Sequence, residues 1–202
     1  MRVRRYGSRA ALVDLDRPEQ VLGLHAALAE RPPAGAVELV PAARTLLVRF
    51  DRRQTSFERL TGELMRHSIA AAPERARPVV EVPVRYDGED LADVAAATGL
   101  STSDIAERHA GREYTVAFCG FAPGFAYLTG LDPVLHLPRR ATPRVRVPAG
   151  AVAVAGEYTA VYPHASPGGW QLIGHTELAV WDVDRDPPHL LGPGTRVRFV
   201  PR

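Results

Sequence analysis

The C-terminal part of this sequence is a series of short β-prone segments separated by turns rich in glycine and proline. After residue 112 these segments are Tyr114–Phe118, Arg144–Val147, Val152–Ala155, Ala160–Tyr162, Leu178–Trp181 and Arg196–Val200. A further strand is expected at Val79–Val84, followed by two helices that end at Gly99 and near Gly111. Many short strands at this spacing are typical of a closed sheet, so the region predicts a β-barrel.

The first 72 residues follow a different pattern, in which helical segments alternate with strands. The expected elements are strands at Ala10–Asp14, Val37–Val40 and Thr45–Phe50 and helices at Pro18–Glu30 and from Thr55 through Ala70. The second helix is predicted from the capping-box pattern of Thr55 to Glu58. The order βαββα predicts a small ferredoxin-like α/β domain. Taking Pro73–Pro78 as the linker, we expect an α+β chain with domains at 1–76 and 77–202.

Composition excludes several kinds of protein and of chemistry. No apolar run approaches the roughly 20 residues of a membrane span, and the N-terminus leads into no signal-peptide core, so we expect a cytoplasmic location and no membrane partner. All 25 basic residues other than histidine are arginine. Without lysine the chain can form neither a Walker A phosphate loop nor a Schiff base. Any ATP chemistry would therefore need another subunit.

The charges are unevenly distributed, although the net charge of +2 is too small to indicate nucleic-acid binding. Residues 1–78 carry 14 arginines and 9 acidic residues, whereas residues 79–202 carry 11 and 14. Within the acidic part, the segment LPRRATPRVRVP contains Arg139, Arg140, Arg144 and Arg146 without any acidic residue. It is either a solvated edge strand or an anion site, since guanidinium groups bind carboxylates and phosphates well. Strand alternation predicts Arg144 and Arg146 on one face, with Arg139 and Arg140 in the preceding loop.

Two segments combine glycine, proline and large aromatic residues in a way that suits neither a helix nor a simple strand. They are FCGFAPGFAYLTG at residues 118–130 and SPGGWQLIGHT at residues 166–176. Glycine permits positive φ and a close approach to a ligand, and proline fixes φ. The two segments predict either two walls of one pocket or two tight barrel corners whose Phe and Trp side chains fill the core.

Few side chains in these segments carry obvious chemistry. His175 ends a glycine-rich segment and is a candidate general acid or base, with a surface histidine as the alternative. Gln171 can read an amide or lactam through its paired donor and acceptor, or it can face water. Ser166 has no nearby His and Asp partners, and the single Cys119 is either a nucleophile or a buried structural thiol. No histidine pair has metal-ligand spacing, so no metal site is expected.

Four collinear segments carry a resemblance to a known family. They are GFAPGFAYLTGLDP, LPRRATPRVRVPAGAVAVAG, SPGGWQLIGHT and GPGTRVRFVP, all within residues 79–202. These motifs resemble the family of B-type subunits of 5-oxoprolinase, also called allophanate hydrolase subunit 1, which includes the Kip-type histidine-kinase inhibitors. The resemblance implies a cyclophilin-like β-barrel behind the N-terminal domain.

The resemblance also implies a function that this chain cannot perform alone. Members act with a related C-type subunit and a third lactam-utilisation subunit, and the complex opens 5-oxoproline to glutamate with ATP as co-substrate. Substrate or anion binding is then expected at Arg139, Arg140, Arg144 and Gln171. The pocket loops implied by the family motifs are Gly120, Phe121, Pro123, Gly124, Phe125, Ser166, Gly168, Gly169 and Trp170.

Two other functions remain open at this point. A regulatory inhibitor of a sensor histidine kinase would need an exposed binding surface and no catalysis. A peptidyl-prolyl isomerase is suggested by analogy of fold alone. Allophanate, urea and other small amides are alternative substrates to 5-oxoproline.

Overall fold

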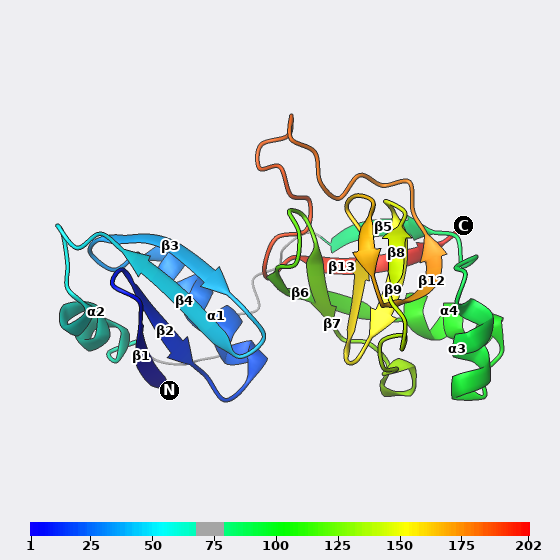
Figure 1. Ribbon diagram of the computed structural model, residues 1–202, viewed down its shortest axis with the longest axis horizontal. Coiled ribbons are helices and arrows are strands. Elements are labelled where there is room, and N and C mark those ends of the chain that lie inside the picture. The colour runs from blue at the N-terminus through cyan, green and yellow to red at the C-terminus, as the bar shows by residue number, and fades with distance from the viewer. Residues whose placement is uncertain (68–78) are drawn as a thin grey trace. The chain divides into compact units, whose positions relative to one another are not determined.

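The computed structural model describes residues 1–67 and 79–202 (Figure 1). The chain divides into two compact units, Met1–Ala76 and Arg77–Arg202, which are taken in turn below. The linker predicted at residues 73–78 and the helix end predicted at Ala70 lie outside the described residues.

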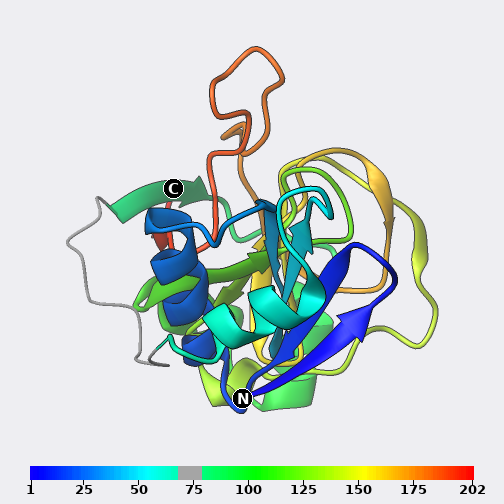
Figure 2. The same cartoon turned by 90° about the vertical axis from the view of Figure 1, so that its left-hand side faces the viewer.

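The N-terminal unit is a four-stranded antiparallel sheet with two helices packed against it. The strand order is β1-β2-β4-β3, with β1 at Arg2–Tyr6, β2 at Ala10–Asp14, β3 at Ala36–Pro41 and β4 at Thr45–Phe50. Helices α1 (Pro18–Glu30) and α2 (Phe57–Leu64) contribute Leu24, Leu28, Leu60 and Leu64 to the same core. Figure 2 shows this unit from its own side, with both helices and the sheet. The ferredoxin-like prediction is confirmed.

Two details of this unit differ from the prediction. Strand β1 was not expected, because its Arg-rich sequence shows no alternation of apolar and polar residues; it is an edge strand and mostly exposed. It occupies the edge that a C-terminal strand takes in a ferredoxin-like sheet. Helix α2 begins one residue later than predicted, since Ser56 and not Thr55 is its N-cap and accepts a hydrogen bond from Arg59 N at 3.3 Å.

The C-terminal unit is a nearly closed barrel. Its seven strands run in the order β12-β9-β10-β7-β6-β13-β5. The strands are β5 (Val79–Val84), β6 (Glu113–Cys119), β7 (Ala126–Thr129), β9 (Ala151–Ala155), β10 (Tyr158–Val161), β12 (Gln171–His175) and β13 (Arg196–Pro201). A backbone bridge between Arg85 and His175 joins the two edges, with N–O distances of 2.8 and 2.9 Å. The barrel prediction is confirmed.

Smaller elements surround the barrel strands. Strands β8 (Arg144–Val147) and β11 (Ser166–Gly168) form a separate two-stranded ladder. Helix α3 (Leu91–Thr98) ends at Gly99 with φ of +71°, and α4 (Thr102–Ala110) begins with a capping box between Ser101 and Asp104. A short 3₁₀ helix, η1, spans Pro133–Leu135.

The prediction of a strand at Leu178–Trp181 is wrong. Only an isolated bridge between Trp181 and His189 forms there, because the chain turns back on itself, with Asp182 N bonded to Pro188 O at 3.0 Å. Conversely, β7, β11 and β12 lie inside the glycine-rich segments that predict loops. In β12, Gly174 does not interrupt the strand, since it pairs with Val152 of β9.

Strand β9 explains how the barrel is packed. All five of its residues are buried, with Val152 and Val154 in the main core that also holds the inner faces of α3 and α4. Ala151, Ala153 and Ala155 point to a second cluster with Phe125 and Trp170. The strand is therefore covered on both faces, and its outer cover brings the two glycine-rich segments and the arginine segment together.

Candidate functional site

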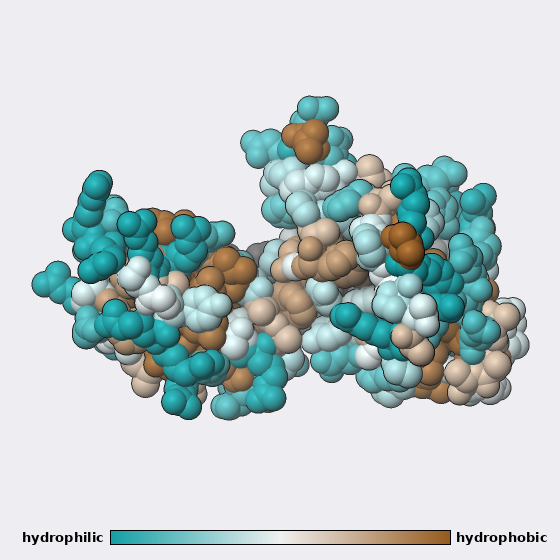
Figure 3. Space-filling view, viewed as in Figure 1, coloured by the Kyte–Doolittle hydropathy of each residue, from teal (hydrophilic) through white to brown (hydrophobic). Residues whose placement is uncertain are grey.

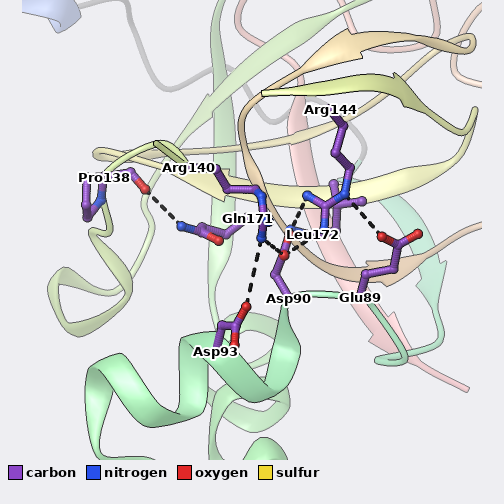
Figure 4. Close-up of polar contacts among 8 residues, drawn as sticks. All are labelled: Glu89, Asp90, Asp93, Pro138, Arg140, Arg144, Gln171 and Leu172. Carbon is purple, nitrogen blue, oxygen red and sulfur yellow. Dashed lines mark hydrogen bonds and ion pairs between the residues drawn. The ribbon is translucent and has the colours of Figure 1, made fainter. Parts of the chain in front are cut away.

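The arginine segment is organised by one buried carboxylate that the sequence did not single out. Asp90 stands at the N-terminus of α3 and is 1% exposed. Its carboxylate oxygens accept hydrogen bonds from Arg144 at 2.7 and 2.8 Å, from the backbone N of Leu172 at 2.7 Å, and from Arg140 (Figure 4). One side chain thus ties together α3, β8, β12 and the loop before β8.

The charge of Asp90 is maintained by these partners. Burial by itself raises the pKa of the carboxyl group, but the hydrogen bonds from Arg144 and from Leu172 outweigh it, so the pKa is lowered overall. The positive end of α3 also favours an anion at this position. Asp90 is therefore ionised at neutral pH and fixes the two guanidinium groups in space.

All three guanidinium nitrogens of Arg144 form hydrogen bonds within the protein. Its two terminal nitrogens donate to Asp90, and its Nε donates to Glu89 Oε2 at 3.1 Å. Each nitrogen therefore already faces a carboxylate, and the side chain is 17% exposed. This arrangement suits a residue that positions the loop better than one that clamps a free carboxylate.

Arg140 differs from Arg144 because part of its guanidinium is unused. Its backbone N donates to Gly169 O at 2.7 Å, and its terminal nitrogen contacts Asp90 and lies 3.9 Å from Asp93 Oδ2. Its Nε is buried and has no hydrogen-bond partner among the described residues. Figure 4 shows the guanidinium between the side chains of Gln171 and Asp90. A buried donor without a partner is costly unless a ligand or water satisfies it.

Gln171 completes this end of the site. Its amide nitrogen donates to the backbone oxygen of Pro138 at 3.2 Å, which orients the amide. Within the described residues no hydrogen bond reaches its carbonyl oxygen. Arg140 Nε and the Gln171 amide oxygen are therefore one buried donor and one acceptor without a partner among the described residues.

The other two arginines of the run lie outside this network. Arg139 and Arg140 precede β8, as predicted, whereas the predicted pairing of Arg144 with Arg146 on one surface does not describe the contacts. Arg146 is exposed and forms no ion pair in the described part of the chain, and the residue that shares Asp90 with Arg144 is Arg140. Val145 is 90% exposed and Val147 fully buried, so the valines do not form one buried face either.

The two glycine-rich segments meet through buried rings. Phe125 and Trp170 are both buried, with ring centroids 5.4 Å apart at nearly right angles. Gly124 lies against Trp181 with φ of +78°, where a Cβ would stand 2.6 Å from the Trp181 Cβ. Phe125 and Trp170 thus fill the core, which is the barrel-corner alternative, while the glycine backbones and Arg140 form the rim beside them.

The other residues of these segments differ in their exposure. Phe121 is 62% exposed with φ of +68°, an unusual conformation for a residue other than glycine. Pro123 is also exposed. A side-chain Cβ at position 120, now Gly120, would meet no atom closer than 3.8 Å, so there is free space beside this glycine. Gly168 and Gly169 flank the Arg140 backbone contact, and the Ser166 hydroxyl is buried without a partner among described residues.

The structure does not bring His175 together with Gln171. The two residues stand at opposite ends of β12, about 13 Å apart at roughly 3.3 Å per residue. His175 closes the barrel through its backbone, and its ring packs against Gly150. A molecule the size of a lactam cannot touch both side chains.

Cys119 behaves as the structural thiol of the two alternatives. Its Sγ lies 3.4 Å from Leu191 O, and burial raises the pKa of the thiol. Residues 1–67 and 79–202 contain no cluster of His, Cys, Asp and Glu suited to a metal ion. In the same residues no helix is long and apolar enough to cross a membrane.

Asp90 is the residue of the candidate site that sequence reasoning missed. The only local signal is an acidic residue at a helix start, and such a residue normally caps its own helix. Here the carboxylate makes no cap hydrogen bond and instead accepts from Arg140, Arg144 and the backbone N of Leu172. Its partners lie 50 to 82 positions later in the chain, where no local pattern can indicate them.

Comparison with known proteins places this chain in a family. Residues 1–191 match the family described as carboxyltransferase domain, subdomain C and D. The chain is 43% identical over 209 residues to the B-type subunit of 5-oxoprolinase from Escherichia coli O157:H7, covering 97% of this chain and 94% of that protein. It is 40% identical to the B-type subunit of 5-oxoprolinase from Bacillus subtilis, covering 90% of this chain and 84% of that protein.

Solved structures agree with the fold. The crystal structure of TTHA0988 is 43% identical with a TM-score of 0.86, covering 96% of this chain and 40% of that longer chain. The urea amidolyase of K. lactis has a TM-score of 0.71 at 21% identity, covering 99% of this chain and 15% of that one, which supports the fold alone. This chain belongs to the family of B-type subunits of 5-oxoprolinase.

Proposed function

We propose that this chain is a subunit of an ATP-dependent hydrolase that opens 5-oxoproline to glutamate, and that it acts only together with a C-type subunit and a third lactam-utilisation subunit. The observation that carries the proposal is the 43% identity to a B-type subunit of 5-oxoprolinase over nearly the whole chain. The absence of lysine supports dependence on partners, because this chain lacks the residue that most phosphate loops use. Since ATP is a co-substrate, we place the complex in the cytoplasm.

The chemistry explains the need for ATP. A five-membered lactam is resonance-stabilised, so water attacks its carbonyl carbon slowly. Transfer of the γ-phosphoryl group of ATP to the lactam oxygen yields ADP and activates that carbon. One water then adds, the C–N bond breaks as the nitrogen takes a proton, and an acyl phosphate remains. A second water releases glutamate and inorganic phosphate.

In this reaction the Arg140 end of the site would recognise the substrate. A lactam presents one N–H donor and one C=O acceptor side by side. The Gln171 amide oxygen would accept a hydrogen bond from the lactam N–H, and Arg140 Nε would donate one to the lactam oxygen. Backbone amides of the loop at Gly168 and Gly169 would stabilise oxyanion charge that develops on the carbonyl. Asp90 and Arg144 would hold this arrangement, and His175, at the far end of β12, takes no part in it.

The kinase-inhibitor alternative receives no support from the relatives. The two curated relatives reported above are named as subunits of 5-oxoprolinase, one solved structure is named as urea amidolyase, and none of the printed names is that of a kinase inhibitor.

Reconstitution tests the proposal. The purified chain alone should show no ATP hydrolysis that depends on 5-oxoproline, whereas the chain mixed with both partner subunits should release glutamate and phosphate. Allophanate and urea serve as competing substrates in the same assay. Robust turnover by the chain alone would contradict its dependence on partners. Turnover of urea or allophanate by a complex that does not turn over 5-oxoproline would contradict the assignment of 5-oxoproline as the substrate.

The arginine assignments are tested in the same reconstituted complex. Arg140→Ala should lower kcat/KM by tenfold or more, since a charge-assisted hydrogen bond contributes about 1.5–3 kcal/mol. Arg140→Lys keeps the charge but not the Nε donor, so it should not restore activity. Arg146→Ala is the matched control and should behave as wild type. Equal kinetics for Arg140→Ala and Arg146→Ala would remove Arg140 from the site.

A further inference from the structure

The N-terminal unit carries a cavity that the proposed function does not use. Its volume is about 660 Å³, within the usual size of small-ligand sites, and it lies at the end of β4. Four arginines line it: Arg9, Arg49, Arg52 and Arg53. Figure 3 shows a mostly hydrophilic surface over this part of the unit.

Most of the positive charge in this cavity is not neutralised by the protein. Arg49 pairs with Glu38. The side chains of Arg9, Arg52 and Arg53 form no ion pair in the described part of the chain. Unpaired guanidinium groups gathered around one concavity repel each other, and a bound anion removes that repulsion.

The single acidic residue of the lining, Asp51, offsets only part of this charge and forms no ion pair with these arginines in the described part of the chain. Asp51 caps the turn that follows β4: its Oδ1 accepts from Arg53 N at 2.9 Å, and its backbone oxygen accepts from Gln54 and Thr55. The turn thereby holds Arg52 and Arg53 next to each other. The backbone bond from Phe50 N to Arg9 O, at 2.9 Å, places Arg9 beside the same turn. Backbone hydrogen bonds thus fix the main chain at Arg9 and Arg53, while the three side chains are exposed.

We propose that this cavity binds the phosphate chain of a polyphosphate-bearing small molecule. Guanidinium groups bind phosphate oxygens in a bidentate manner, and three of them suit an anion of several negative charges. The concave shape suits a small molecule better than a flat protein surface. Val37, 58% exposed in the lining, offers an apolar contact for a ring attached to the phosphates. A nucleoside triphosphate and a free polyphosphate share this chemistry.

Binding to the full-length chain tests the site without any assay of hydrolase activity, so its result is independent of the proposed function. Titration calorimetry at low ionic strength uses ATP, inorganic tripolyphosphate and adenosine as probes. ATP and tripolyphosphate should bind, and both affinities should fall as salt is added. Tighter binding of ATP identifies a nucleotide as the ligand, whereas equal affinities identify the phosphate chain alone.

Substitutions then locate the binding. Arg9→Ala, Arg52→Ala and Arg53→Ala should each weaken binding by about five- to tenfold, as expected for one charge-assisted contact at a solvated site. Arg44→Ala is the matched control: it removes the same charge from an exposed residue just before β4, at the strand's opposite end. The affinity of the Arg44→Ala variant for ATP and tripolyphosphate should stay within about twofold of that of wild type. Equal losses in Arg44→Ala, no binding of tripolyphosphate, or binding of adenosine that ignores the arginine variants would overturn the proposal.

Discussion

Acidification should destabilise the barrel unit through one buried histidine. His109 is fully buried, with Nδ1 at 2.8 Å from the Tyr86 hydroxyl and Nε2 at 2.9 Å from Thr159 Oγ1. The Thr159 hydroxyl donates its proton to Ala153 O at 3.0 Å. Since that proton is used, Nε2 must carry the hydrogen toward Thr159, and Nδ1 accepts from Tyr86. The imidazole is therefore neutral, and both of its nitrogens are satisfied.

The size of the effect follows from the pKa. Burial lowers the pKa of His109 from 6.5 to about 3. Above pH 6.5 the residue is neutral in the folded and the unfolded chain, so it adds no pH dependence. As the pH falls, the unfolded chain takes up the proton first, and the folded state loses about 1.4 kcal/mol per pH unit. Between pH 7 and pH 5 this amounts to about 2 kcal/mol.

Urea unfolding followed by tryptophan fluorescence measures this loss of stability in the barrel unit itself. The chain has two tryptophans, Trp170 and Trp181, and both belong to the barrel unit. The free energy of unfolding of wild type should drop by about 2 kcal/mol more between pH 7 and pH 5 than that of His109→Gln. An equal drop in the two proteins would refute the reasoning, as would an NMR titration in which His109 protonates near pH 6.5.

Three further predictions test individual contacts. Gly124→Ala should destabilise the barrel unit by about 2 kcal/mol or more, since the position combines positive φ with a Cβ too close to Trp181; thermal unfolding measures it. Asp90→Ala should cost about 3 kcal/mol or more in urea unfolding, because it leaves Arg144 partly buried beside an empty position, and wild-type stability would contradict the network. Cys119 should react with a thiol reagent far more slowly in the folded chain than in urea, and equal rates would contradict its burial.

Much of the fold follows from local sequence signals. Helix α4 is predictable because Ser101 begins it with a capping box, and the end of α3 is predictable because Gly99 can take the left-handed conformation. The barrel strands in which apolar and polar residues alternate, or which consist of small apolar residues, are predictable from that pattern. In each case the signal lies within a few residues of the element that it specifies.

The strands that were missed lack such a signal. Strand β12 contains Gly174, and its Leu172 and Ile173 are buried in different clusters, so no period of two is visible. Strand β1 is charged because it lies at a sheet edge and is mostly exposed. In both cases the neighbouring strands, not the local sequence, determine the conformation.

The candidate site depends on contacts that no local pattern contains. Alternation placed Arg144 and Arg146 on one face, but Arg144 turns to Asp90, 54 positions earlier in the chain. Which arginine retains a free donor depends on how β12, α3 and the loop before β8 meet. That arrangement follows from closure of the barrel, so Arg140 could be recognised only from the structure.

The arginines of the two candidate sites differ in how far the protein neutralises their charge. In the barrel unit, Arg140 and Arg144 are paired with Asp90 and Glu89, so their charge is largely neutralised and a donor such as Arg140 Nε is what remains. A neutral lactam ring requires hydrogen bonds of defined direction more than net charge. In the cavity of the N-terminal unit, Arg9, Arg52 and Arg53 form no ion pair among the described residues, which suits a polyanion and gives little directional selectivity for an amide. We therefore expect the two sites to select different ligand chemistry, a neutral amide beside Arg140 and a polyanion beside Arg9, Arg52 and Arg53.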